Sequence, residues 1–116
     1  MIINPTDFPA IHPLGLVTAD ILKKIGMNVE LVEADWGTVV QRRASKEPIE
    51  KGGWSIFHTF GSAPAYATPA TSPIIRGQGQ TAWFGWWESA KAEELAQAWL
   101  DAPDEAARAK AGAEMG

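Results

Sequence analysis

The sequence predicts an α/β fold in which strand, helix, strand, helix and strand follow one another over residues 1–60. Apolar residues recur at helical spacing over residues 14–25 and then alternate with polar ones over residues 27–33, the period of a half-buried strand. Strand–helix–strand units place successive strands in parallel through right-handed crossovers. We therefore expect a mostly parallel or mixed sheet, followed by C-terminal helices.

The first strand is expected at Ile2 and Ile3, and the first helix begins near Pro13, since proline suits a first helical turn. Gly26 suits the left-handed residue that closes such a helix. The apolar positions of this helix form one stripe, the pattern of an amphipathic helix, and are Leu14, Val17, Ile21, Leu22 and Ile25.

The second strand is predicted at Met27–Glu33, and Asp35 is placed to cap a second helix by accepting backbone N–H bonds. The inner face of that helix is expected to comprise Trp36, Val39, Val40 and Arg43. Residues 54–60 are almost continuously apolar, which is typical of a central strand covered on both faces.

Residues 61–81 are rich in proline and glycine and predict a long irregular connection. A crowded aromatic segment follows at residues 83–87, and a helix is expected from about Glu88. Its apolar face would comprise Ala92, Leu95, Ala96, Trp99 and Leu100. A turn with a cap at residues 101–104 then leads into a fourth, alanine-rich helix.

A length of 116 residues suits a single domain, which we place at residues 1–116, and the net charge of −4 argues against a nucleic-acid partner. The sequence has no cysteine, so disulfides and thiolate metal sites are excluded. Neither His12 nor His58 stands in a cluster with metal-ligand spacing, and we expect His58 to be structural. Because no acid–base or nucleophile constellation stands out, we expect no metal, no cofactor and no enzyme activity.

Several segments, in their order along the chain, resemble the extracellular solute-binding protein family 5, the substrate-binding proteins of peptide/nickel-type ABC transporters. The residues that carry the resemblance are GMNVEL (26–31) after an amphipathic helix, DWGT (35–38) followed by Arg42 and Arg43, GGWSIF (52–57), and WFGW (83–86) before a Glu/Ala-rich helix. The resemblance covers nearly the whole chain. It implies a fragment of the C-terminal lobe region, that is, a partial lobe of a periplasmic-binding-protein-like fold.

This resemblance implies a ligand-binding component of an ABC importer that closes two lobes by a hinge over a peptide or another small solute. It also implies a transporter permease as partner and a periplasmic location. No signal peptide is visible at the N-terminus, so we expect that segment to lie outside this fragment. Peptide-binding members of the family place an aspartate after the third strand to pair with the ligand's α-amino group. Residues 59–66 contain no acid, which puts an ordinary peptide ligand in doubt.

Six residues form the expected ligand-binding set: Thr59, Phe60, Tyr66, Trp83, Trp86 and Trp87. The aromatic segment is too crowded for one strand face to bury, so part of it should face a ligand or absent parts of the parent protein. For the same reason the fragment is expected to self-associate. The alternative is a free-standing α/β interaction or carbohydrate-binding module that uses the Trp-rich segment as a stacking platform.

Overall fold

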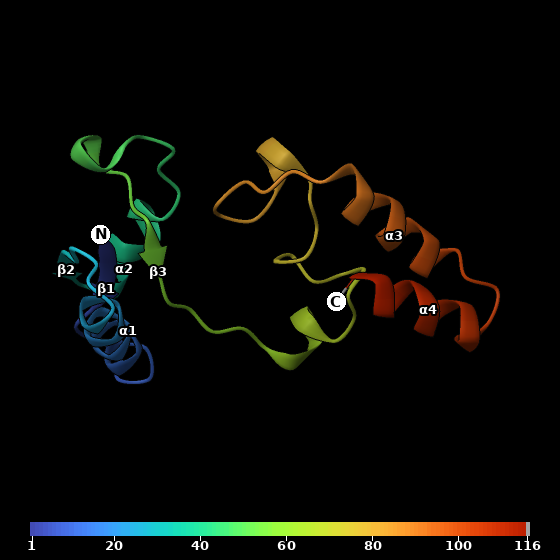
Figure 1. Ribbon diagram of the computed structural model, residues 1–116, viewed down its shortest axis with the longest axis horizontal. Coiled ribbons are helices and arrows are strands. Elements are labelled where there is room, and N and C mark those ends of the chain that lie inside the picture. The colour runs from blue at the N-terminus through green and yellow to red at the C-terminus, as the bar shows by residue number, and fades with distance from the viewer. Residues whose placement is uncertain (116) are drawn as a thin grey trace. The chain divides into compact units, whose positions relative to one another are not determined.

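The computed structural model describes residues 1–115, which form two compact units that meet in sequence at Phe60 and Gly61 (Figure 1). The first unit holds the sheet and two helices, and the second holds two helices and a long irregular segment.

The sheet of the first unit has three parallel strands in the order β2-β1-β3, as Figure 1 shows. These strands are β1 (Ile2–Pro5), β2 (Leu31–Ala34) and β3 (Ile56–Phe57). Ile3 lies beside Val32 on one side and beside Phe57 on the other. The predicted α/β class and parallel sheet are therefore confirmed.

The central strand is β1, and the prediction that the third strand is central was wrong. All four residues of β1 are buried, whereas β3 has two half-buried residues and lies at the sheet edge. The apolar run at residues 54–60 arises instead from aromatic contacts: the Trp54 and Phe57 rings meet edge to face with centroids 4.8 Å apart. A run of large apolar residues can therefore arise from aromatic packing as well as from a buried strand.

The second strand begins at Leu31 and not at Met27, as the alternation had predicted. Gly26 has a φ of 89° and Met27 donates a backbone hydrogen bond to Leu22, so these residues still belong to the end of the helix. The chain reaches its place beside β1 only where Ile2 donates to the Glu30 carbonyl. The first part of the alternating pattern therefore belongs to the end of the helix and not to the strand.

Helix α1 (His12–Lys24) has its proline in the first turn, as predicted, but it does not use its apolar stripe to cover the sheet. Its buried residues are Gly15 and Ala19. The side chain of Asn4 in β1 occupies the space where a Cβ on Gly15 would stand, so only a very small residue fits at this contact. Leu14, Val17, Ile21 and Ile25 are left exposed.

Helix α2 (Trp36–Arg42) is capped by Asp35, whose Oδ1 accepts a hydrogen bond from the Thr38 backbone at 2.9 Å. Hydrogen bonds from Thr38 lower the pKa of Asp35. Val39 is buried, in keeping with the predicted inner face. After the 3-10 helix η1 (Ile49–Lys51), the Gly53 carbonyl accepts two hydrogen bonds from Arg42, at 3.1 and 3.2 Å, which ties the approach to β3 to the end of α2.

The second unit begins with irregular chain that contains the 3-10 helices η2 (Ala63–Tyr66) and η3 (Gly79–Thr81). Helices α3 (Ala90–Leu100) and α4 (Glu105–Met115) then pack together as a hairpin. Ser89 and Asp104 cap them by accepting backbone bonds, from Ala92 at 3.2 Å and from Ala107 at 2.8 Å. Leu95, Ala96 and Ala111 form the buried contact.

Candidate functional site

Three aromatic residues, each just beyond the end of a strand, meet at the carboxyl edge of the sheet in the first unit. Phe8 follows β1, Trp36 follows β2 and Phe60 follows β3. The ring centroids lie 5.1 Å apart for Phe8 and Trp36, 5.2 Å for Phe8 and Phe60, and 6.4 Å for Trp36 and Phe60. We call this group the carboxyl-edge cluster. Parallel strands bring their carboxyl ends to one edge, so residues far apart in sequence converge there.

The position of this cluster in the sheet is a recognised one for binding sites. From β1 the chain crosses to β2 on one side and then returns to β3 on the other side of β1. The strand order therefore reverses between β1 and β3, and open α/β sheets bind ligands in the crevice beyond the carboxyl ends of the strands at such a point. The stacked rings of Phe8 and Phe60 lie at this end of the sheet.

Polar contacts hold the loops around the cluster. Asp7 accepts a hydrogen bond from the Trp36 backbone at Oδ1 (2.7 Å), and Thr6 donates one to the Ala34 carbonyl (3.3 Å). The loop after β1 is thus fixed to the start of α2. Phe60, by contrast, is 61% exposed, so its ring is stacked on one side and presented to solvent on the other. A flat exposed ring is suited to stacking or apolar contact with a ligand.

The second unit has a loop, residues 80–86, that carries most of the crowded aromatic residues. Backbone hydrogen bonds close its base, from Gly79 to the Trp87 carbonyl at 2.9 Å and from Ser89 to the Gly77 carbonyl at 3.0 Å. We call residues 77–89 the tryptophan loop. Within it the Trp86 N–H donates to the Trp83 carbonyl at 2.9 Å. Trp86 has a φ of 51°, a left-handed conformation that is uncommon for a residue with a Cβ.

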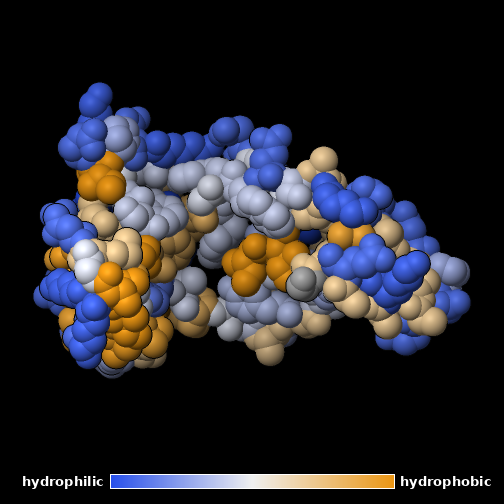
Figure 2. Space-filling model, viewed as in Figure 1, coloured by the Kyte–Doolittle hydropathy of each residue, from blue (hydrophilic) through white to orange (hydrophobic). Residues whose placement is uncertain are grey.

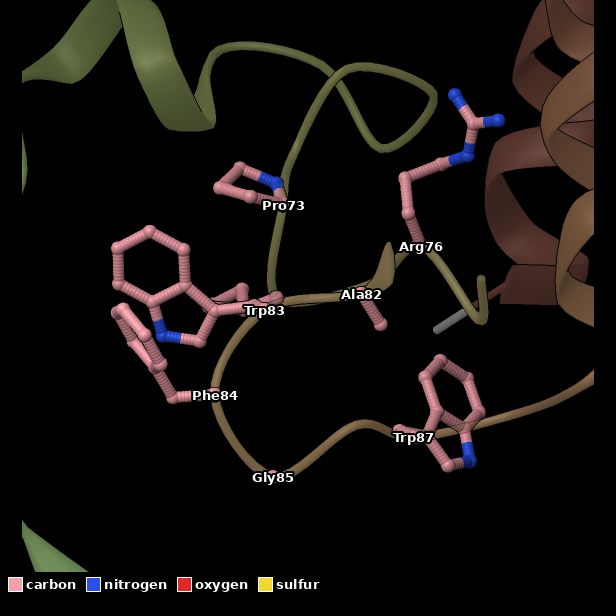
Figure 3. Close-up of a pocket in the computed structure, with 8 residues that line it drawn as sticks. Pro73, Arg76, Ala82, Trp83, Phe84, Gly85 and Trp87 are labelled. Atoms are coloured by element: carbon pink, nitrogen blue, oxygen red, sulfur yellow. The ribbon is translucent and has the colours of Figure 1, made fainter. Parts of the chain in front are cut away.

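A shallow pocket of about 250 Å³ lies against this loop (Figure 3). Trp83 and Phe84 meet edge to face with ring centroids 5.0 Å apart, and Trp87 is 49% exposed. The complete lining consists of Pro73, Ile74, Arg76, Ala82, Trp83, Phe84, Gly85 and Trp87. This is a largely apolar surface with aromatic walls, suited to flat or apolar groups.

Arg76 is the charged residue of this lining, and its guanidinium is paired with Glu93. Its Nε and Nη2 donate to the two carboxylate oxygens of Glu93 at 2.8 and 2.6 Å, and its Nη1 donates to the Ala70 carbonyl at 3.0 Å. Figure 3 shows the guanidinium turned away from the aromatic rings. The ion pair lowers the pKa of Glu93 and raises that of Arg76. The pocket is therefore a poor match for a charged ligand group.

The six predicted ligand residues are distributed over both units. Phe60 belongs to the carboxyl-edge cluster and Thr59 adjoins it, while Trp83 and Trp87 line the pocket. Trp86 lies in the turn of the tryptophan loop and outside the lining, and Tyr66 ends η2. Phe8 was not among the predicted site residues, and Trp36 was predicted to lie on a helix face. Their position just after predicted parallel strands was the signal that could have identified them.

His58 follows β3 and lies against α1. Its Nε2 is 2.8 Å from the Thr18 hydroxyl, and its Nδ1 is buried without a hydrogen-bond partner among the described residues. Burial lowers the pKa of His58, which favours the neutral ring. Within residues 1–115, no group of three or more His, Asp or Glu side chains is arranged to hold a metal ion.

No protein-family profile matches the chain. A curated relative does: the chain is 36% identical over 100 residues to a protein of Sinorhizobium fredii (strain NBRC 101917 / NGR234) described as "Probable peptide ABC transporter periplasmic-binding protein y4tO". The match covers 86% of this chain and 19% of the relative, so the chain spans about a fifth of that protein's length.

This identity supports the assignment of the chain to the solute-binding proteins of ABC transporters, of which it covers a part. The parallel three-stranded sheet with its helices is consistent with a partial lobe of a periplasmic-binding-protein-like fold. The relative is described as a probable transporter binding protein. Among the described residues, none of the helices has the length and apolar character needed to span a bilayer.

Proposed function

We propose that this chain, whose relative is a peptide transporter's periplasmic-binding protein, contributes part of one ligand-binding lobe to such a protein. The observation that carries the proposal is the carboxyl-edge cluster at the point where the strand order reverses between β1 and β3. Aromatic rings there offer apolar area at low conformational cost. The proposed ligand is a peptide or another small solute. The proposed cellular location of the protein is the periplasm.

The proposed mechanism is hinge closure, in which this lobe and a second lobe enclose the solute and exclude water. Phe60, supported by Phe8, would contact the solute from this lobe. The closed, loaded form would then deliver the solute to a transporter permease. Closure couples binding to transport because only the loaded protein holds the two lobes together.

A chimera tests this proposal. The matched segment of the Sinorhizobium relative is replaced by the corresponding residues of this chain, and peptide binding is measured by calorimetry. We expect binding, and we expect Phe60→Ala to weaken it about tenfold, the effect of losing roughly 1.4 kcal/mol of contact. Met27→Ala is the control, because Met27 is 53% exposed and precedes β2, at the opposite edge of the sheet. A folded chimera that binds no peptide, or equal losses in the two variants, would contradict the proposal.

The tryptophan-loop pocket favours one alternative, a carbohydrate-binding module that stacks sugar rings on Trp83 and Trp87. Titration of the 116-residue chain with oligosaccharides, followed through the indole N–H signals, separates the two functions. Specific shifts at Trp87 that Trp87→Ala abolishes would favour the carbohydrate module. Their absence would leave the solute-binding lobe as the better proposal.

A further inference from the structure

Arg43, the residue that caps the C-terminus of α2, lies against two aromatic rings of the first unit. The Cζ of its guanidinium is 5.7 Å from the centroid of the Trp36 ring and 5.9 Å from that of the Phe57 ring. A guanidinium within about 6 Å of an aromatic centroid is attracted by the negative face of the ring. The Arg43 side chain therefore joins the first residue of α2 to the edge strand β3.

The length of α2 brings Arg43 and Trp36 to the same face of the helix. The Arg43 backbone N–H donates to the Val39 carbonyl at 3.0 Å, so the helical turn continues through Arg43. Residues seven apart lie about two turns apart on one helix face, and side chains lean toward the N-terminus. The long Arg43 side chain thus reaches the Trp36 ring. Its carbonyl accepts a hydrogen bond from the Trp54 indole at 3.0 Å, which fixes this end of α2 to the chain just before β3.

Phe60, the ring that the proposed function places against the solute, depends on these contacts in two ways. It lies outside any helix or strand and is 61% exposed. Its ring is supported by Phe8, with centroids 5.2 Å apart, and Phe8 in turn contacts Trp36 at 5.1 Å. Its backbone follows β3, three residues after Phe57. Arg43 therefore contacts both the ring behind this support and the strand from which Phe60 emerges.

We propose that Arg43 is a positioning residue for the ligand site, which fixes the orientation of the Phe60 ring through the two rings that it contacts. The inference rests on the proposed function, because that function assigns Phe60 to the solute. A ring that is held in its binding orientation before the solute arrives loses less conformational entropy on binding. Loss of the Arg43 guanidinium should therefore weaken binding and leave the sheet in place.

NMR of the 116-residue chain tests the positioning by itself. Arg43→Met keeps an apolar stem and removes the cation, and we expect the NOEs between the Phe8 and Phe60 rings to fall by about half or more. Arg43→Lys keeps a cation and should retain more of the NOE intensity, and it serves as the test if Arg43→Met does not fold. Arg42→Met is the matched control, because the Arg42 guanidinium binds the Gly53 carbonyl, and it should leave these NOEs unchanged. Amide exchange of β1 in each variant verifies that the sheet is intact.

A double-mutant cycle in the chimera described above tests the effect on the solute. Arg43→Met should lower the peptide affinity about fivefold when Phe60 is present and less than about twofold in the Phe60→Ala background, because residues that act through one another are not additive. A merely structural role would lower the affinity equally in both backgrounds.

Three results would overturn the proposal: equal losses of affinity in the two backgrounds, unchanged ring NOEs in the folded Arg43 variants, or the same loss of NOEs in Arg42→Met. A folded chimera that binds no peptide would contradict the proposed function instead. The NOEs of the chain alone would still decide whether Arg43 orients the Phe60 ring.

Discussion

Glu93 accepts hydrogen bonds from three donors and thereby fixes the base of the tryptophan loop. Its carboxylate receives two bonds from Arg76 and one from the Gly77 backbone, the latter at 2.9 Å. These bonds connect the first turns of α3 to the chain that precedes the pocket. We expect Glu93→Gln to lower the free energy of unfolding by about 1–2 kcal/mol, because charge-assisted bonds are lost at a partly buried site.

The effect of Glu93 should depend on pH. The pKa of Glu93 is lowered in the folded protein, mainly by the bonds from Arg76, so its stabilising contribution is present above the unfolded pKa of about 4.3. It is lost as the pH falls through the folded value. Urea unfolding at pH 7 and in acid should therefore show a difference between wild type and Glu93→Gln that shrinks on acidification. Glu94→Gln is the control, since its pair with Lys91 is exposed at 3.4 Å, and equal effects would contradict the prediction.

His58 should also make the free energy of unfolding decrease on acidification, at a higher pH than Glu93 does. Burial lowers its pKa, so the unfolded chain binds a proton more readily than the folded chain does. Stability is then complete above the unfolded value of about 6.5 and decreases as the pH falls toward the folded value. Replacing His58 with Gln should remove this slope in urea unfolding between pH 7.5 and 5. An imidazole that titrates above 6.5 in NMR would show that the ring is not buried as described.

At the scale of elements, the tryptophan loop depends on a close backbone contact between Gly77 and Ser89. A Cβ on Gly77 would lie 2.7 Å from the Ser89 backbone nitrogen, too close for the pairing that closes the loop. We expect Gly77→Ala to open the base of the loop, with faster amide exchange at Gly79 and Ser89. Overpacking of this kind costs about 1–3 kcal/mol.

Gly112→Ala provides the comparison for that change. Gly112 lies in α4, and the nearest atom to an added Cβ is 3.8 Å away. Alanine in a helix interior is favoured over glycine by about 1 kcal/mol, so this variant should be as stable as wild type or more so. Unchanged amide exchange at the loop base in Gly77→Ala would mean that the contact is not as tight as the structure describes.

At the scale of the whole molecule, we expect the 116-residue chain by itself to bind peptides only weakly. One lobe face cannot exclude water from both sides of a ligand, and residues 59–66 carry no carboxylate to pair with an α-amino group. Calorimetry with mixtures of di- to pentapeptides is the measurement. A micromolar or tighter dissociation constant would contradict the expectation and would mean that the proposed second lobe is not needed for binding.

Self-association is the other expectation for the whole chain, and the structure offers two surfaces for it. The exposed apolar face of α1 (Figure 2) presents Leu14, Val17, Ile21 and Ile25, and the tryptophan loop presents Trp87. Sedimentation of wild type should show association that Val17→Glu with Ile21→Glu reduces. Trp86→Ser with Trp87→Ser should reduce it if the aromatic residues contribute. A wild-type chain that stays monomeric at high concentration would exclude both surfaces as drivers.

The features that the sequence determined by itself are those set by neighbours along the chain. Proline in the first turn of α1, the left-handed Gly26 and the capping carboxylate of Asp35 depend on local backbone geometry, and each was predicted and is present. Hydrophobic periodicity likewise predicted the α/β class, because alternation and helical spacing reflect the two backbone repeats. The ligand-binding set and the single-domain organisation remain predictions.

The tertiary structure alone decided which faces are buried and which strands are neighbours. The apolar stripe of α1 did not predict its buried face, because the Asn4 side chain leaves no room for a Cβ on Gly15, and the residues of α1 that are buried are Gly15 and Ala19. The central place of β1 depends on strand order, which pairs residues more than twenty positions apart and leaves no mark in a local pattern. For the same reason the carboxyl-edge cluster of Phe8, Trp36 and Phe60 emerged only when three strand ends were brought to one edge.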